Sequence, residues 1–206
     1  MIRVQYGCGL SAPAGWINFD SSPTLQLQRL PLIGRWMNGL VKPVFPKAVR
    51  YGDIVKGLPL PPRAADLVYC SHVLEHLALH DLRQALRNTF KCMRSGGIFR
   101  MVLPDLRALA EAYVSDQSHE SAPRFMRDTY LGHTTRRRGL AGLLRAGFGN
   151  SLHLWMWDFS SLSAELAEAG YKDIRRASFG DSMDSAFAAV EELHRWDGQL
   201  GIECQT

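Results

Sequence analysis

Gln5-Tyr6-Gly7-Cys8-Gly9 is the stretch of sequence that says most about the fold of this chain. It follows the apolar residues Ile2 and Val4 and precedes Gly15-Trp16-Ile17-Asn18-Phe19-Asp20. A strand that runs into a glycine turn lets backbone N–H groups approach a ligand closely. A second short strand that ends in a carboxylate supplies an acceptor for a ribose hydroxyl. Together the two segments predict a nucleoside-cofactor site at the start of the chain.

The composition is that of an ordinary globular protein with one domain. The chain has 206 residues, of which 46% are hydrophobic and 21% are charged, enough for one substantial core. No apolar run approaches the roughly 20 residues that cross a bilayer, and the chain opens on a strand rather than a secretion signal. The 4 cysteines form no C-x-x-C pair, which argues against a zinc knuckle or a disulfide framework. We therefore expect a cytoplasmic protein.

Apolar runs alternate with helical patterns along the chain, which predicts an α/β domain with a mostly parallel sheet. Strands are expected at 2–6, 16–19, 48–51, 66–70, 97–103, 172–178 and 199–204. Helices are expected at Asp81–Arg94, from a cap at Ser160 or Ser161 to Gly170, and at 184–196.

The segment 22–47 has apolar residues at helical spacing with basic residues among them. A basic amphipathic segment can lie on a membrane surface, so peripheral membrane contact is one interpretation. We favour the other, in which the apolar stripe covers the sheet and prolines break the helix. We expect one domain over 1–206, with 22–47 and 115–158 as insertions that form a lid or the substrate side.

Arginines are concentrated in one region of a chain whose net charge is +4. They are Arg124, Arg127, Arg136, Arg137, Arg138 and Arg145. One interpretation is a solvated surface, and the other is a rim that attracts an anionic acceptor.

Further motifs follow the first two in a recognisable order. They are Tyr51-Gly52-Asp53-Ile54, Leu58-Pro59-Leu60-Pro61, the run from Ala65 through Ser71-His72-Val73-Leu74-Glu75-His76 to Leu77, and Arg94-Ser95-Gly96-Gly97 to Pro104-Asp105. The series resembles the class I S-adenosylmethionine-dependent methyltransferases, specifically their small bacterial type-11-like branch. The resemblance spans nearly the whole chain. It implies a Rossmann-like seven-stranded, mostly parallel sheet of order 3-2-1-4-5-7-6 with flanking helices, and a cofactor beyond the carboxyl ends of the strands.

The resemblance also implies which residues bind the cofactor S-adenosylmethionine and its product S-adenosylhomocysteine. Tyr6, Gly7, Cys8 and Gly9 would line the methionine and ribose portion, Asp20 would hold the ribose hydroxyls, and Asp53 with Ile54 would meet the adenine. Ser71 and His72 would lie near the sulfonium and the incoming acceptor. The family usually has an acid where this chain has Gln5, and a third glycine is absent. Gln5 keeps a hydrogen bond but loses the charge.

Methyl transfer needs alignment more than acid–base chemistry, because the sulfonium is already activated. His72 is the candidate base for a hydroxyl or protonated amine acceptor, since histidine titrates near neutrality. The alternative is that His72 closes the pocket by hydrogen bonding. We expect Glu75 to be structural and Asp105 to cap the following helix. A small-molecule, glycan or lipid-linked acceptor ranks above nucleic acid, because no Asn-Pro-Pro-Tyr-like tetrapeptide follows the fourth strand.

Two other functions are weighed against the methyltransferase interpretation, which assigns no metal ligand. His72, Glu75 and His76 fit the H-x-x-E-H pattern of zinc peptidases, with Glu165 or Glu168 as a further ligand. That pattern requires one helix through the motif and leaves Asp20 and Asp53 unexplained. A catalytically inactive binding subunit is the second alternative, favoured by Gln5 and the missing glycine.

Overall fold

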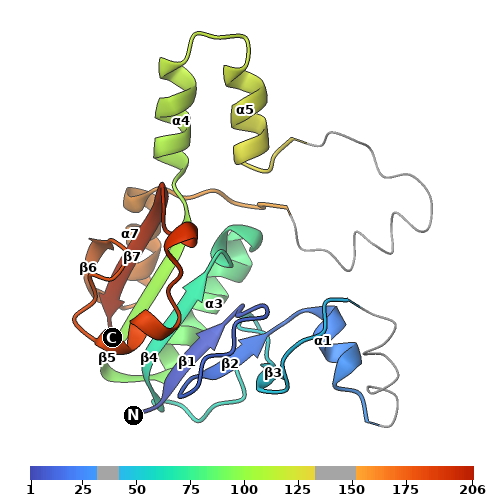
Figure 1. The fold of residues 1–206 in the computed structure, drawn as a ribbon. Helices are drawn as coiled ribbons and strands as arrows, with labels where there is room; N and C mark the ends of the chain where they lie inside the picture. Colours follow the sequence, from blue (N-terminus) through green and yellow to red (C-terminus); the bar gives the residue numbers. More distant parts are fainter. Residues whose placement is uncertain (32–41, 133–151) are drawn as a thin grey trace.

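The structure is a computed structural model that describes residues 1–31, 42–132 and 152–206. Its centre is a seven-stranded sheet of order β3-β2-β1-β4-β5-β7-β6 (Figure 1). The strands are β1 (Arg3–Tyr6), β2 (Ile17–Asp20), β3 (Val49–Tyr51), β4 (Ala65–Ser71), β5 (Met93–Pro104), β6 (Lys172–Ala177) and β7 (Gln199–Gln205). Only β7 runs antiparallel to its two neighbours, β5 and β6. The predicted fold class and strand order are confirmed.

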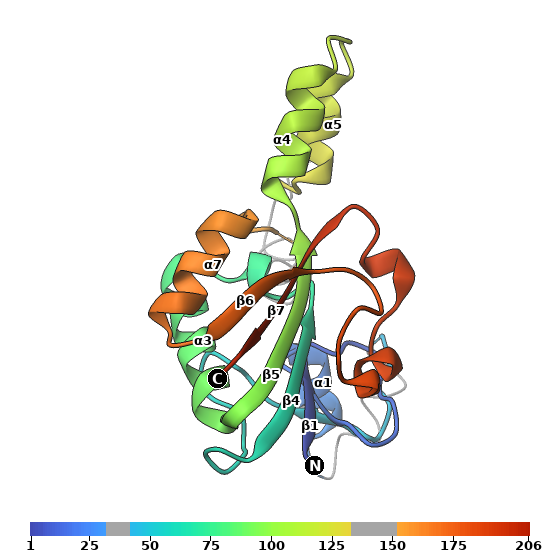
Figure 2. The same ribbon diagram turned by 90° about the vertical axis from the view of Figure 1, so that its left-hand side faces the viewer.

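Two layers cover the two faces of the sheet. On one face lie α3 (Leu79–Cys92) and α7 (Phe159–Glu168), next to each other (Figure 2). Their buried leucines join the main core: Leu82, Leu86, Leu162 and Leu166. On the other face the C-terminal segment packs Phe187, Val190 and Trp196 against side chains of β4 and β5. Because side chains alternate along a strand, Val68 faces the first core and Tyr69 the second.

The expected helix at 184–196 is not formed. The segment contains two short 3-10 helices, η2 (Ser185–Ala189) and η3 (Leu193–Arg195), with Glu192 extended between them. The carboxylate of Glu191 in this segment forms an ion pair with the buried guanidinium of Arg100. This contact and the apolar packing override the helical pattern.

Two other helix boundaries also differ from the prediction. α3 ends at Cys92, so the glycines at 96 and 97 lie inside β5 instead of stopping the helix. The N-cap of α7 is Asp158, whose carboxylate accepts the N–H of Ser161 at 2.8 Å while the Ser161 hydroxyl accepts the N–H of Asp158. This reciprocal capping box lowers the pKa of Asp158.

A helical hairpin of α4 (Leu106–Ser115) and α5 (Ser121–Asp128) stands out from the body of the protein (Figure 1). Asp105 caps α4 as predicted, since its carboxylate accepts the N–H groups of Arg107 and Ala108. On the hairpin, Arg124 pairs with Asp116 at 3.2 Å and Arg127 with Glu120 at 3.6 Å. The other members of the arginine cluster, Arg136, Arg137, Arg138 and Arg145, lie outside the described residues.

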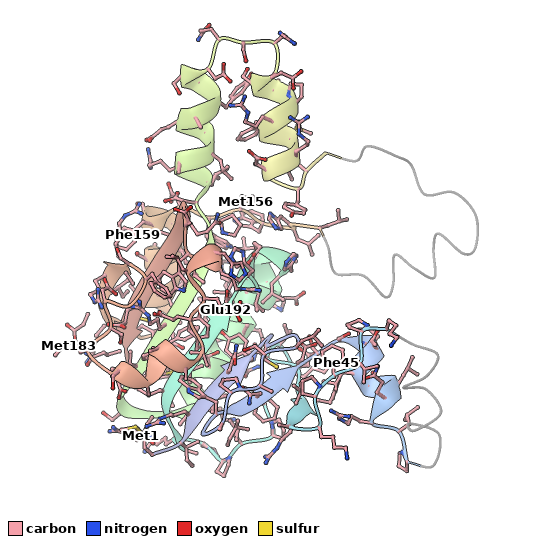
Figure 3. The ribbon with its side chains drawn as sticks, in the orientation of Figure 1. Met1, Phe45, Met156, Phe159, Met183 and Glu192 are labelled. Atoms are coloured by element: carbon pink, nitrogen blue, oxygen red, sulfur yellow. The ribbon has the colours of Figure 1, made fainter. Side chains whose placement is uncertain are left out.

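The described part of segment 22–47 covers the β3 edge of the sheet. The helix α1 (Pro23–Gln28) is short, and Leu25 packs with Cys8, Phe45 and Val49. The Phe45 side chain lies beside α1 (Figure 3). Residues 32–41, which hold much of the predicted amphipathic stripe, are outside the described part. Among the residues that are described, no helix is long and apolar enough to cross a membrane.

Candidate functional site

Two cavities on either side of the glycine turn occupy the carboxyl ends of β1, β2 and β4. One, of about 450 Å³, is lined by Gly7, Asp20, Asp53, Ile54, His72 and residues beside them. The other, of about 260 Å³, is lined by Gln5, Gly7, Cys8, Gly9, Ser71, Arg195 and their neighbours. Gly7 belongs to both, so one extended ligand can span them. The larger cavity has the size of a small-molecule site, and the smaller one would extend it.

The glycine turn has the conformation that its sequence predicts. Gly7 and Gly9 both have positive φ angles, +62° and +55°. A Cβ atom on Gly7 would lie 2.2 Å from Cγ2 of Val73, so this position has no room for a side chain. The Cys8 N–H donates to the Phe19 carbonyl at 3.1 Å, which fastens the turn to β2. The turn therefore has a fixed conformation, and its backbone can approach a ligand closely.

The Asp20 carboxylate joins the glycine turn to the start of α1 through two hydrogen bonds. One carboxylate oxygen accepts the Gly9 N–H at 2.9 Å, and the other accepts the Ser22 N–H at 2.8 Å. Each carboxylate oxygen has a second acceptor site. Asp20 can therefore accept further hydrogen bonds from vicinal hydroxyls in the larger of the two cavities.

Asp53 and Ile54 border the same cavity from the β3 side. Asp53 accepts the Val55 N–H at 3.0 Å, and Lys56 lies 3.2 Å from its other oxygen. Asn88 of α3 donates to the carbonyls of Ile54 and Val55, each at 2.8 Å. Sequence reasoning missed Asn88, which fixes the loop that would hold an adenine.

Tyr6 departs from its predicted place. Its side chain is buried in the main core, where its hydroxyl accepts a hydrogen bond from Thr89, and it lines neither cavity. Burial, with Asp20 nearby, raises the pKa of the Cys8 thiol to about 12. Cys8 is therefore a packing residue rather than a nucleophile.

Arg195 joins the C-terminal segment to the strand ends. Its guanidinium donates to the Ser71 hydroxyl at 2.7 Å and to the Ser71 carbonyl at 3.0 Å. Its own carbonyl lies 3.0 Å from Nε2 of His72. Sequence reasoning misses Arg195, because the periodicity of 184–196 predicts a continuous helix. Arg195 therefore fixes both Ser71 and His72 at the carboxyl end of β4.

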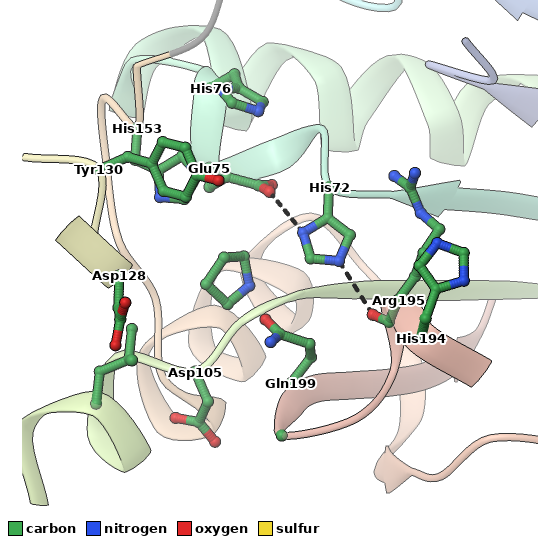
Figure 4. Close-up of a pocket in the computed structure, with 13 residues that line it drawn as sticks. His72, Glu75, His76, Asp105, Asp128, Tyr130, His153, His194, Arg195 and Gln199 are labelled. Atoms are coloured by element: carbon green, nitrogen blue, oxygen red, sulfur yellow. Dashed lines mark hydrogen bonds and ion pairs between the residues drawn. The ribbon is translucent and has the colours of Figure 1, made fainter. Parts of the chain in front are cut away.

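Both ring nitrogens of His72 face a fixed partner. Nε2 donates to the Arg195 carbonyl, and Nδ1 lies 3.2 Å from a carboxylate oxygen of Glu75 (Figure 4). His72 also has a positive φ of +52°, a conformation that costs energy outside glycine. This geometry favours the interpretation in which His72 closes the pocket by hydrogen bonding.

A third cavity, of about 640 Å³, opens on the other side of His72 (Figure 4). Its polar lining includes His72, Glu75, His76, Asp105, Asp128, Tyr130, His153, His194 and Arg195. His153 comes from the far end of the predicted insertion 115–158, and burial lowers its pKa. A neutral imidazole at this place can accept a proton, a hydrogen bond or a metal ion.

The requirements of the H-x-x-E-H pattern are not met in this segment. η1 (Leu74–His76) is a single 3-10 turn that ends at the extended Leu77, and α3 begins only at Leu79. The ring of His72 turns to Glu75 and Arg195 instead of sharing a helical face with His76. Glu165, one of the expected further ligands, forms a two-pronged ion pair with Arg83.

Comparisons with known proteins bear on the fold and the family. Residues 37–101 match a family model described as a methyltransferase domain. A SAM-dependent methyltransferase from Archaeoglobus fulgidus has a TM-score of 0.52 at 16% identity, with 100% of this chain and 86% of that one covered. A SAM-dependent methyltransferase from Thermotoga maritima, described as a possible histamine N-methyltransferase, has a TM-score of 0.53 at 13% identity and coverages of 99% and 81%.

A third similar structure is phosphoethanolamine N-methyltransferase 2 of Haemonchus contortus with phosphomonomethylethanolamine and S-adenosylhomocysteine. Its TM-score is 0.50 at 11% identity, with 100% of this chain and 49% of that one covered. No curated protein matches the chain. The predicted resemblance to the S-adenosylmethionine-dependent methyltransferases is confirmed by the family model over residues 37–101, and the solved structures show the same fold.

Proposed function

We propose that this protein transfers a methyl group from S-adenosylmethionine to a small polar acceptor bound in the 640 Å³ cavity beside His72. The observation that carries the proposal is the alignment of three features at one edge of the sheet. These are the glycine turn, the carboxylate of Asp20 and the loop of Asp53, on cavities that adjoin the third one at His72 and at Arg195. A cofactor in the first two cavities would present its methyl group to the third.

The lining of the third cavity supports a small molecule or a glycan over a lipid chain. Asp105, Asp128 and Tyr130 offer hydrogen bonds to hydroxyls or amines, and few apolar side chains line the cavity. Arg195 is the lining residue that favours an anionic group. Because Asp128, Tyr130 and His153 come from 115–158, we infer that this insertion forms the substrate side.

In this proposal His72 is a positioning residue. Because Nε2 donates to the Arg195 carbonyl and Nδ1 faces Glu75, the His72 ring is fixed in place between the cofactor and acceptor cavities. Proximity and alignment can supply roughly 7–11 kcal/mol of a displacement barrier without a base.

The test is an acceptor screen that follows S-adenosylhomocysteine release from S-adenosylmethionine. Small phosphorylated molecules, amines, hydroxylated glycans and lipid-linked glycans form separate panels. Release that depends on one panel supports a methyltransferase with that class of acceptor. Tight cofactor binding with no release on any panel would support the inactive binding subunit, and metal-dependent cleavage of peptides in a parallel assay would support the peptidase.

Gln5 gives a prediction about cofactor affinity. Its side chain is buried beside the 260 Å³ cavity, and its Oε1 has no hydrogen-bond partner among the described residues. An ammonium group of the cofactor can supply that partner. Replacing the amide by a carboxylate adds roughly 1 kcal/mol to such a hydrogen bond, so we expect Gln5→Glu to bind S-adenosylhomocysteine about fivefold more tightly.

Gln5→Leu is the matched control, since it keeps the size of the side chain and removes the acceptor. In calorimetric titration, we expect Gln5→Glu to bind S-adenosylhomocysteine more tightly than the unmodified protein and Gln5→Leu to bind it more weakly. Equal affinities for the two variants would show that Gln5 does not contact the cofactor.

A further inference from the structure

Glu75, His76 and His153 stand close together in the wall of the acceptor cavity (Figure 4). Each of the three offers one ligand atom, and these atoms all lie within 4.8 Å of one another. Two histidines and a carboxylate form one of the common ligand sets of catalytic zinc sites. In a tetrahedral zinc site, ligand atoms at about 2.1 Å from the ion lie ~3.4 Å apart, so binding needs the three side chains to draw closer together.

Two buried polar atoms of the group have no hydrogen-bond partner among the described residues. The Glu75 side chain is 1% exposed, and its Oε2 has no hydrogen-bond partner within the described residues. The buried Nδ1 of His153 also has none in the described part of the chain. A buried polar atom without a partner costs roughly 1–3 kcal/mol. A bound ligand that contacts both atoms would remove this cost.

The backbone fixes the two segments that carry the group. Glu75 accepts the N–H groups of Leu154 and Trp155 through its carbonyl, at 2.8 and 3.2 Å. Nδ1 of His76 donates to the Leu152 carbonyl at 2.9 Å, which leaves Nε2 with a lone pair for an ion. A histidine ligand typically has its other nitrogen held in this way.

Ring packing restricts the imidazoles further. The ring of His153 contacts those of His76 and Tyr130, with centroids 5.1 and 4.7 Å away. His72 is outside the group, because its nitrogens face Glu75 Oε1 and the Arg195 carbonyl. The set therefore differs from the H-x-x-E-H motif in both membership and geometry.

We propose that Glu75, His76 and His153 bind a divalent transition-metal ion such as Zn²⁺, with an open coordination position toward the acceptor cavity. The role of the ion rests on the proposed function: it would hold an oxygen or nitrogen atom of the acceptor near the methyl donor. Binding of the ion itself does not depend on that function.

Zinc titration of the untagged full-length protein, freed of metal beforehand, tests the proposal. We expect one Zn²⁺ per chain by calorimetry and by metal analysis after dialysis. His76→Ala and His153→Ala should each weaken binding by more than about 100-fold, because loss of a ligand's hydrogen-bond partner alone costs about 10–100-fold. His80→Ala is the matched control, an exposed histidine four residues farther along the chain, and should bind zinc normally.

Circular dichroism melting of each variant, and S-adenosylhomocysteine titration of the same samples, separate the outcomes. If His153→Ala does not fold, the partly exposed His76 still gives a decisive variant. Cofactor binding without zinc binding overturns the metal site and leaves the methyltransferase proposal standing. Zinc binding that survives His76→Ala overturns the ligand assignment. Zinc binding without cofactor binding keeps the site and contradicts the proposed function.

Discussion

Asp20→Ala is expected to weaken S-adenosylhomocysteine binding by at least about 100-fold, since each hydrogen bond to a charged group contributes about 1.5–3 kcal/mol. The variant would remove the proposed acceptor for the ribose hydroxyls. It also releases the N–H groups of Gly9 and Ser22, which Asp20 holds at 2.9 and 2.8 Å. Calorimetric titration of the purified variant measures the change.

His72→Ala is the comparison for this experiment. Since His72 borders the cofactor cavity but its nitrogens are turned to Glu75 and Arg195, we expect its loss to weaken binding by less than about tenfold, roughly one ordinary hydrogen bond. Thermal melting shows whether each variant is folded. If His72→Ala abolished binding while Asp20→Ala left it intact, the site assignment would be wrong.

Arg100→Ala is expected to give the largest loss of stability of any single substitution considered for this protein. Arg100 is fully buried, and its guanidinium pairs with Glu191, with Glu203 at 3.0 Å and with Asp181 at 2.9 Å. It also stacks on Trp196 at 4.5 Å. Removing one partner of a buried ion pair costs about 3–5 kcal/mol, because the remaining charges stay buried.

For a chain of 206 residues this loss corresponds to a fall in melting temperature of roughly 6–20 °C. Arg83→Ala is the matched control, since Arg83 pairs with Glu165 at the surface and its side chain is 43% exposed. Surface pairs contribute at most about 1 kcal/mol. Equal melting temperatures for the two variants would contradict a stabilising role for the buried cluster.

The sheet and the cofactor edge could be predicted from the sequence because their signals are local. Each strand is a short apolar run, and the turn at Gly7–Gly9 and the carboxylate of Asp20 adjoin the strands that position them. Resemblance to a family then gave the strand order, which no local pattern contains. Tyr6 shows a limit of predicting site residues from a motif, because its position in the motif does not determine whether the side chain points to the site or to the core.

The rest of the site depends on contacts between distant parts of the chain. Glu191 is 91 residues from Arg100, and Arg195 is 124 residues from Ser71. These contacts turn an expected helix into two 3-10 turns and bring its end to the strand edge. The placement of His153 beside His76 likewise follows from backbone hydrogen bonds between segments far apart in the sequence. Periodicity in one segment contains no information about such pairings.

Calorimetric titration with S-adenosylhomocysteine, with and without chelator, shows directly whether the protein binds the cofactor product and whether a metal ion is needed. We expect binding to one site per chain that is unchanged by chelator, because the proposed ribose and adenine contacts come from Asp20 and Asp53, and of the Glu75–His76–His153 group only His76 lines the cofactor cavity. No binding by the folded protein would contradict the account and would favour a methyltransferase-like domain that has lost its cofactor.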